Sequence, residues 1–299
     1  MHVTRRLILG ASGSLALPGL LRAQGPVPVR IGEINSYTSI PAFTLPYRNA
    51  MQLAVEQINA KGGVLGRPIE LITRDDAGRP QDAVRLAGEL VNDQKVDVLA
   101  GAYFSNVGLA LGEYAAQNKR LYIGGEPLTD AMVWEKGNRY TFRLRPSTYM
   151  QATILAEEAA KLPARRWATV APNYEFGQSG VKWFRQLLSA RRPDVQFVGE
   201  QWPALGRVDA GATVQALEAM KPDGILNVLF GPDLTNFVRQ GSTRGLFERR
   251  SVASLLTGEP EYLDPLGDEA PEGWVVTGYP GEEVDTPAHK AFAAAYRAK

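Results

Sequence analysis

The sequence has 299 residues and a mass of 32.6 kDa, enough for one large domain or two lobes of about 150 residues each. Its formal net charge of +1 excludes the strongly basic surface of a nucleic-acid-binding protein, so no nucleic-acid partner is predicted. The absence of cysteine excludes disulfides, thiolate metal sites, cysteine nucleophiles and a lipid-modified amino-terminal cysteine.

The amino terminus has the pattern of an export signal. Arg5 and Arg6 precede an apolar stretch from Leu7 to Leu21, and small residues follow near Ala23. This pattern predicts a signal peptide over residues 1–23 and a periplasmic protein. The paired arginines resemble the twin-arginine signal, but that route and general export both stay open. A membrane anchor is the alternative, although the stretch is shorter than the roughly 20 residues that span a bilayer.

The next part of the chain alternates between predicted strands and helices. Apolar runs predict strands at 27–31, 69–73, 96–100 and 121–123. Apolar residues at helical spacing predict helices over 49–60, from Pro80 to Val91, and over 107–116. These elements form a first α/β lobe, which we place at residues 24–145.

The alternation then restarts after Pro146, which leads into a helix predicted at 149–161. The second lobe is placed at residues 146–275, with its remaining strands and helices in turn at 167–171, 179–190, 195–198, 214–220, 225–230, 234–240, 252–256 and 274–277. Residues 276–299 would begin a return crossover and a helix. Because the last helical pattern has no stop signal, the C-terminal part of the fold is expected to be missing.

The segment INAKGGVLGRPIELITRDD, from Ile58 to Asp76, resembles the branched-chain amino-acid binding proteins, the type I periplasmic solute receptors. DVLAGAYFS, PNYEFGQSG and TGEPEYLD add to the resemblance, which runs from about Val27 to Tyr296. It implies an α/β fold of two Rossmann-like lobes joined by three crossovers, with the ligand held at the hinge. It also implies the ligand-binding component of an ABC transporter, a monomer whose partner is a membrane permease and which needs no cofactor or metal.

Ligands of open α/β sheets bind beyond the carboxyl ends of the strands, so we look for site residues in the loops there. Tyr103, Phe104 and Ser105 follow the strand at 96–100. A serine at a helix entrance can hydrogen-bond a carboxylate, and in the family the matching segment holds the ligand's carboxylate. Ser105 is therefore the first choice for this role, with a simple helix cap as the alternative.

Two acidic residues are further candidates. Glu126 and Pro127 stand where related proteins commonly offer small and hydroxyl residues, and this departure weakens the case for amino-acid recognition. Glu126 could pair with a cationic ligand group, or it could be a solvated loop acid. The resemblance places Glu259 where family members offer an acid to the ligand's amino group.

Aromatic residues gather in the predicted loops and could wall a pocket for a partly apolar ligand. Phe43 matches the position of a pocket aromatic in the family. The other aromatic candidates are Tyr149, Tyr174, Phe176 and Phe230. Each of them alone is also compatible with core or hinge packing.

No enzyme is predicted, because His2 lies in the signal and His289 in the last helix, and no nucleophile or nucleotide motif is present. The predicted function is periplasmic binding of a small amino acid or related carboxylate for an ABC uptake transporter. One alternative is a receptor of the same fold for aromatic acids, amides or urea-like solutes. Another is a sensory module, which an export signal without a second membrane segment disfavours.

Overall fold

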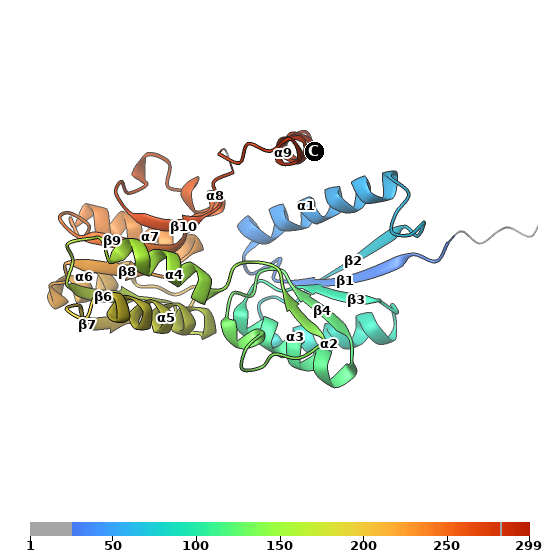
Figure 1. Cartoon of the computed structure of the whole chain (residues 1–299), viewed down its shortest axis with the longest axis horizontal. Helices are drawn as coiled ribbons and strands as arrows, with labels where there is room; N and C mark the ends of the chain where they lie inside the picture. Colours follow the sequence, from blue (N-terminus) through green and yellow to red (C-terminus); the bar gives the residue numbers. More distant parts are fainter. Residues whose placement is uncertain (1–25, 282) are drawn as a thin grey trace, which may run out of the picture.

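The structure, a computed structural model, describes residues 26–281 and 283–299. The predicted signal peptide at 1–23 lies outside these residues. Two α/β lobes lie side by side, each built around one sheet (Figure 1). Among the described residues, no helix combines the length and the apolar character needed to cross a membrane.

The first lobe holds a five-stranded parallel sheet in the order β2-β1-β3-β4-β5. Its elements are β1 (Val29–Asn35), α1 (Pro41–Ala60), β2 (Ile69–Asp75), α2 (Pro80–Asn92), β3 (Val98–Gly101), α3 (Ser105–Asn118), β4 (Leu121–Gly124), the 3₁₀ turn η1 (Asp130–Met132) and β5 (Thr141–Arg143).

The second lobe repeats the pattern with the sheet order β10-β9-β8-β6-β7, again with parallel neighbours. Its elements are α4 (Thr148–Ala159), β6 (Arg166–Val170), α5 (Glu175–Arg191), β7 (Gln196–Gln201), α6 (Ala210–Met220), β8 (Gly224–Asn227), α7 (Gly231–Thr243), β9 (Ser251–Gly258), α8 (Pro260–Leu263), the turn η2 (Gly267–Glu269) and β10 (Val275–Gly278). The predicted end of this lobe at residue 275 falls on the first residue of β10.

The predicted fold class is confirmed, and its elements follow from local sequence. In α2 the predicted apolar face of Ala83, Leu86, Ala87, Leu90 and Val91 is buried. Helix α1 differs from its prediction, since it begins at Pro41 rather than near Asn49 and contains Pro46. Proline is usual at a helix start and unusual inside a helix, because it lacks a backbone N–H. The presence of Pro46 therefore led the sequence pattern to miss about the first two turns of α1.

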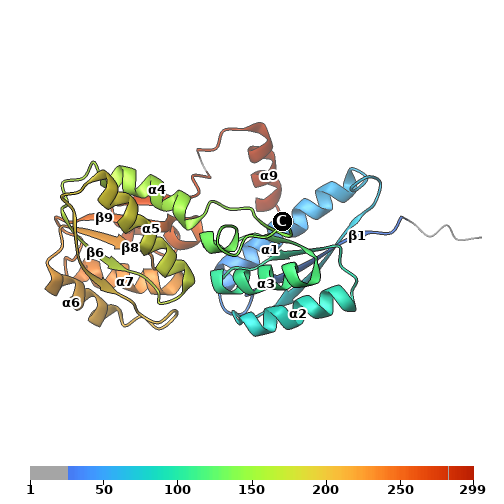
Figure 2. The same cartoon turned by 60° about the horizontal axis from the view of Figure 1, so that its bottom comes forward.

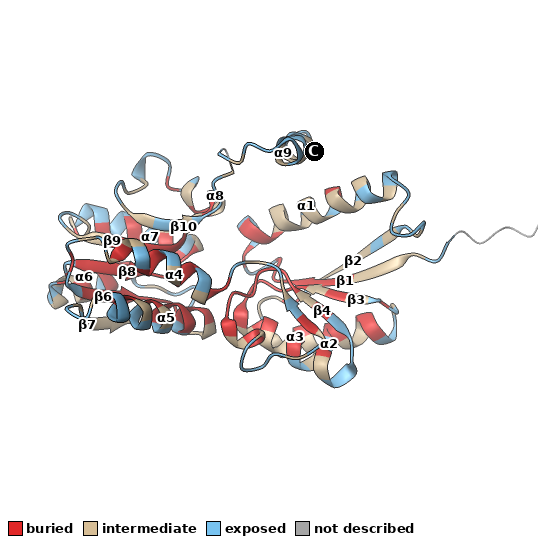
Figure 3. Cartoon of the chain, viewed as in Figure 1, coloured by how far each residue is buried: buried red, intermediate tan, exposed pale blue. Residues whose placement is uncertain are grey.

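Buried residues concentrate in the central strands of each sheet and in the helices that cover them (Figure 3), whereas the edge strands β2, β7 and β10 have no buried residue. In the second lobe, β8 is buried throughout and β9 at all but its two end residues. Trp167 and Phe184 are fully buried with ring centroids 5.4 Å apart, so they anchor α5 on β6. Each lobe therefore has its own apolar core, which leaves the loops at the strand ends free to shape a site.

Within the described residues, two segments connect the lobes. The first crossover, residues 144–147, joins β5 to α4. The second, described at residues 279–281 and 283–286, leads from β10 to α9 (Pro287–Arg297), which returns to the first lobe and lies beside α1 (Figure 2). The hydroxyl of Tyr296 donates to the carbonyl of Pro46 at 3.2 Å, which ties α9 to α1. The expected third crossover stays a prediction.

Candidate ligand-binding site

A small pocket, partly open to solvent, lies where the strand ends of both sheets face each other. Its lining comes from the carboxyl ends of β3, β4, β6, β8 and β9 and the segments just after them, together with one residue of the first crossover. The lining is Tyr103, Ser105, Glu126, Leu128, Arg145, Tyr174, Phe176, Phe230, Leu256 and Tyr262. Parallel sheets leave such a crevice at the carboxyl ends of their strands, and these are the loops in which the sequence argument sought the site.

An aromatic cluster forms the apolar part of the pocket. Tyr103 from the first lobe lies 5.9 Å from Phe230 of the second, measured between ring centroids. The hydroxyls of Tyr103 and Tyr262 are 2.6 Å apart, which makes a hydrogen bond between the lobes. Phe230 also packs against Phe176 at 5.7 Å and Tyr174 at 6.4 Å. These rings give the pocket wide apolar walls with polar tips.

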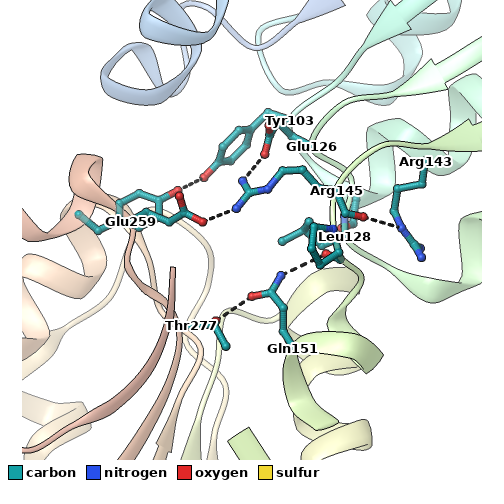
Figure 4. A network of polar contacts seen from close by, with 11 residues as sticks. Tyr103, Glu126, Leu128, Arg143, Arg145, Gln151, Glu259 and Thr277 are labelled. Carbon is teal, nitrogen blue, oxygen red and sulfur yellow. Dashed lines mark hydrogen bonds and ion pairs between the residues drawn. The ribbon is translucent and has the colours of Figure 1, made fainter. Parts of the chain in front are cut away.

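The charged part of the pocket is an ion triad made by Arg145, Glu126 and Glu259 (Figure 4). Arg145 comes from the first crossover, and its guanidinium donates to Glu126 of the first lobe and to Glu259 of the second. The two acid side chains are 8% and 9% exposed and the arginine 22%, so all three charges are largely removed from water. One hinge cation thus holds an acid from each lobe.

Burial controls the ionisation of this triad. Loss of hydration raises the pKa of Glu126 to about 7, although Arg145 works in the opposite direction. Burial also raises the pKa of Glu259, again against the attraction of Arg145. Burial disfavours the charge on Arg145, but the two carboxylates outweigh it and raise the pKa of the guanidinium. Glu126 is therefore a buried, paired acid, and the hypothesis of a solvated loop acid is wrong.

Ser105 lines the pocket but also holds two loops together. It is the first residue of α3, whose N-cap position belongs to Phe104, so the alternative of a serine cap is wrong. The Ser105 hydroxyl oxygen accepts from the backbone N–H groups of Leu128 at 3.2 Å and Thr129 at 3.3 Å. Its own O–H remains able to donate to a ligand carboxylate. Ser105 thus joins the loop after β3 to the loop after β4.

Replacement of Ser105 by alanine is expected to lower the free energy of unfolding by about 1–3 kcal/mol, the cost of buried amides without a partner. The measurement is urea denaturation followed by tryptophan fluorescence. Ser189→Ala, at an exposed position of α5, is the matched control and should stay within about 0.5 kcal/mol of wild type. Equal stability of the two variants would contradict the structural role of Ser105.

Several predicted site residues lie outside the lining. Phe43 and Phe104 are absent from the lining and instead pack against Tyr103, with ring centroids 5.1 Å and 4.9 Å from it. Glu259 reaches the site only through Arg145. Pro127 faces α3, since a Cβ built on Gly108 would lie 2.4 Å from its ring. As ligand contacts, all the predicted site residues stay predictions.

Tyr149 belongs to a different aromatic group, and the structure does not bring it to the pocket. Its ring packs against Trp134 at 5.2 Å and Trp183 at 5.0 Å. Its backbone N–H donates to the buried carboxylate of Asp130 at 2.8 Å, which fixes the first turn of α4 and with it the direction of the tyrosine. A position near the crossover was therefore not enough to place this ring in the cleft.

Sequence reasoning missed Arg145, Leu128, Leu256 and Tyr262 as pocket residues. A signal for Tyr262 was present, because it lies in the TGEPEYLD segment three residues after Glu259. Arg145 stands directly before Pro146, at the predicted boundary between the two lobes, which was the signal that could have found it. No group of acidic or histidine side chains in the described ranges is arranged to hold a metal ion.

The hinge around Arg145 is held by a network that joins both crossovers (Figure 4). The Arg143 side chain donates to the carbonyl oxygens of Arg145 at 3.1 Å and Thr129 at 3.2 Å. On the other side, the Gln151 amide donates to the Pro146 carbonyl at 3.2 Å. Thr277, just before the second crossover, donates to Gln151 at 2.8 Å. These contacts fix the backbone from which Arg145 reaches into the pocket.

Comparison with known proteins agrees with this architecture. The sequence profile of the family described as "Periplasmic binding protein" matches residues 28–299. The Leu/Ile/Val-binding protein of Rhizobium johnstonii is 28% identical over 179 residues, covering 59% of this chain and 47% of that protein. The leucine-, isoleucine-, valine-, threonine- and alanine-binding protein of Pseudomonas aeruginosa is 28% identical over 254 residues, or 83% and 65% of the two chains.

A solved structure is similar over most of the fold. It is the solute-binding protein of an ABC transporter from Rhodopseudomonas palustris BisB5, in complex with 3,4-dihydroxybenzoic acid. The TM-score is 0.78 with 27% sequence identity, and the match covers 91% of this chain and 74% of the other. The chain spans about half to two thirds of the length of the curated relatives above. These matches show that the chain belongs to the periplasmic binding protein family, in the branched-chain amino-acid type that the sequence resemblance indicated.

Proposed function

We propose that this chain is the substrate-binding component of an ABC uptake transporter and captures a small carboxylate between its lobes. The observation that carries the proposal is the pocket itself, in which Arg145 and Ser105 can bind an anion while Tyr103 and Phe230 wall its apolar body. The relatives are named as binding proteins for amino acids, and an amino acid or related carboxylate is the first candidate ligand. The protein acts as a monomeric receptor, not an enzyme, that delivers its ligand to a membrane permease.

The location we propose is the periplasm, after export through the signal at residues 1–23. Members of the family are periplasmic, and the paired residues Arg5 and Arg6 leave the twin-arginine route as the finer hypothesis. Mass spectrometry of the mature protein from cells would test export, since it should find the chain beginning after residue 23. A strain without twin-arginine translocation would retain the precursor only if that route is used.

An aromatic acid is the second candidate ligand. The specific observation is the density of rings at the pocket, where Tyr103, Tyr174, Phe176, Phe230 and Tyr262 all take part in the lining. The similar structure from Rhodopseudomonas palustris contains 3,4-dihydroxybenzoic acid, a flat ring that bears one carboxylate. Stacked and edge-on aromatic contacts suit such a ring better than a branched aliphatic side chain.

A thermal-shift screen tests the proposal and ranks the two candidates. The ligands are leucine, valine, benzoate, 3,4-dihydroxybenzoate and a short amide such as acetamide. A ligand present at one hundred times its Kd stabilises the folded state by about 2.7 kcal/mol, which is a readily measured shift. A shift with acetamide alone, or with none of the five, would contradict a carboxylate receptor.

Tyr103→Ala is expected to weaken the carboxylate that binds best in this screen by about 2 kcal/mol or more, the loss typical of a central aromatic anchor. The reason is that Tyr103 contacts rings of both lobes and hydrogen-bonds Tyr262 across the cleft. Calorimetric titration of the folded variant measures the Kd. Trp183→Ala removes a ring from the other aromatic group, so it is the control and should leave the Kd unchanged.

A further inference from the structure

The pocket contains more negative than positive charge. Glu126 and Glu259 supply two carboxylates, and Arg145 is the cation between them, so the triad carries −1 when both acids are ionised. Glu261, two residues beyond Glu259, adds a third carboxylate whose field raises the pKa of Glu126 further. A ligand carboxylate that pairs with Arg145 would bring the triad to −2 in a largely dehydrated space. Such an excess of buried charge is unfavourable.

Glu126 is the acid that a ligand would meet. It lines the pocket, whereas Glu259 is not part of the lining and touches the site only through Arg145. The ionisable groups that face Glu126 come from every side of the site. They are Arg145 from the first crossover, Glu259, Glu261 and Tyr262 from the second lobe, Tyr103 from the loop after β3, and Tyr47 from α1.

Arg145 can stabilise only part of this negative charge. It already donates to both acids, so an incoming carboxylate must share the guanidinium with them or displace one. Two carboxylates at a shared site favour the state in which one of them is protonated, because like charges at a few ångströms repel strongly in a low dielectric. The buried position of Glu126 already raises its pKa to about 7, so protonation near neutral pH is easy for this acid.

We infer that Glu126 is a specificity-determining residue, which takes up one proton from the solvent when a singly charged anion binds beside Arg145. The proton converts the Glu126 carboxylate to its neutral acid, so the charge of triad plus ligand returns from −2 to −1. The site therefore accepts simple carboxylates at low pH and disfavours them at high pH. The inference rests on the proposed function, in that it takes carboxylates to bind in this pocket.

A ligand that brings its own cation is treated differently. Leucine carries an ammonium beside its carboxylate and adds no net charge, so its binding needs no proton from the solvent. Benzoate and 3,4-dihydroxybenzoate carry one negative charge and no cation. Both ligand classes bring a carboxylate, but only the benzoates add net charge. Comparing them therefore shows whether proton uptake follows the added charge or carboxylate binding in general.

The main experiment is titration calorimetry with benzoate, 3,4-dihydroxybenzoate and leucine at pH 6, 7 and 8, in buffers of different ionisation enthalpy. We expect roughly half a proton to be taken up per bound benzoate at pH 7, because a group with a pKa near 7 is half protonated there before the ligand arrives. Above pH 7 the Kd for benzoate should rise by about tenfold per pH unit. Leucine should show neither effect. In Glu126→Gln the Kd for benzoate should be flat from pH 6 to 8 and close to the wild-type value at pH 6.

A second measurement needs no ligand. The folded-state pKa of Glu126 lies above its ordinary value of 4.5, so its contribution to stability is complete below pH 4.5 and is lost as the pH rises through 7. The Tm of Glu126→Gln minus the Tm of wild type should therefore increase as the pH rises from 5 to 8. A constant difference in Tm across this range would show that Glu126 does not change charge there, and it would overturn the inference.

Glu33→Gln is the matched control. Glu33 is a fully buried acid of β1 whose pKa burial also raises to about 7, and it accepts from the Tyr37 hydroxyl away from the pocket lining. Its replacement should change the pH profile of Tm but leave proton uptake on benzoate binding intact. If proton uptake disappears in Glu33→Gln and persists in Glu126→Gln, then Glu33 and not Glu126 takes up the proton, and the inference is overturned.

The outcomes separate this inference from the proposed function. If leucine binds but neither benzoate binds even at pH 6, the inference is wrong and the carboxylate receptor stands. If the benzoates bind with the same Kd at pH 6 and pH 8 and without proton uptake, the inference is again wrong. If no carboxylate binds at any pH, the proposed function fails, whatever the profile of Tm shows for Glu126.

Discussion

Arg145→Ala is expected to lower the free energy of unfolding by about 3–5 kcal/mol at pH 8, the usual cost of removing one partner of a buried ion pair. The guanidinium contacts Glu126 and Glu259, whose side chains are 8% and 9% exposed. Without it, the two acids must either stay ionised in a dehydrated cleft with no cation between them or take up protons, which is costly at pH 8. Urea denaturation of the ligand-free variant measures the loss.

The loss should shrink as the pH falls. Burial raises the pKa of both acids already, and removal of Arg145 raises it further, so protonation relieves the repulsion below neutral pH. We therefore expect a smaller difference from wild type at pH 5.5 than at pH 8. A loss that does not depend on pH would mean that the arginine acts through packing of its stem rather than through its charge.

Arg239→Ala is the matched control for this prediction. Arg239 pairs with Glu269, but the two side chains are 50% and 53% exposed, and exposed pairs contribute at most about 1 kcal/mol. Both arginines pair with glutamate, but the two partners of Arg145 are buried and the one partner of Arg239 is exposed, so a large loss in Arg145→Ala alone would support burial as the cause. Similar losses for both variants would contradict the burial argument.

Local sequence was sufficient for most of the fold. The apolar spacing in α2 indicates a helix with one buried face, and the apolar run in β8 indicates a strand buried on both faces. Both patterns can be recognised in a few consecutive residues. The start of α1 was the exception. Pro46 inside a helix is permitted here because tertiary packing buries Phe43 and Thr44 in its first turn, a contribution that periodicity cannot report.

The site could be predicted only as far as the strand-end rule reaches. That rule placed Tyr103, Ser105, Glu126, Tyr174 and Phe230 in loops that do meet at the pocket. The strand-end rule could not identify Arg145, because its partners lie 19 and 114 residues away along the chain and come from different lobes. Its importance depends on their joint burial, which no local pattern encodes.

Gly101→Ala is expected to be nearly as damaging as loss of Arg145, although it adds only one methyl group. Gly101 ends β3 with φ of +105°, and a Cβ there would lie 2.3 Å from the backbone carbonyl oxygen of Ile34 and 3.0 Å from Glu33. A left-handed backbone costs a residue with a side chain about 1–2 kcal/mol, and forced overpacking costs about 1–3 kcal/mol more. The expected loss of unfolding free energy is therefore about 2–5 kcal/mol, measured by urea denaturation.

Gly62→Ala separates the two causes of this loss. Gly62 has φ of +95°, close to that of Gly101, but a Cβ there would meet nothing within 4 Å. Gly62→Ala should therefore lose only about 1–2 kcal/mol of unfolding free energy, the cost of the left-handed backbone, and should keep its ligand affinity. In Gly101→Ala the clash must push β3 away from β1. Because the loop after β3 carries Tyr103 and Ser105 of the pocket lining, ligand affinity should fall together with stability. Equal losses in the two variants, with affinity retained in both, would show that the close contact between β3 and β1 does not position the binding loop.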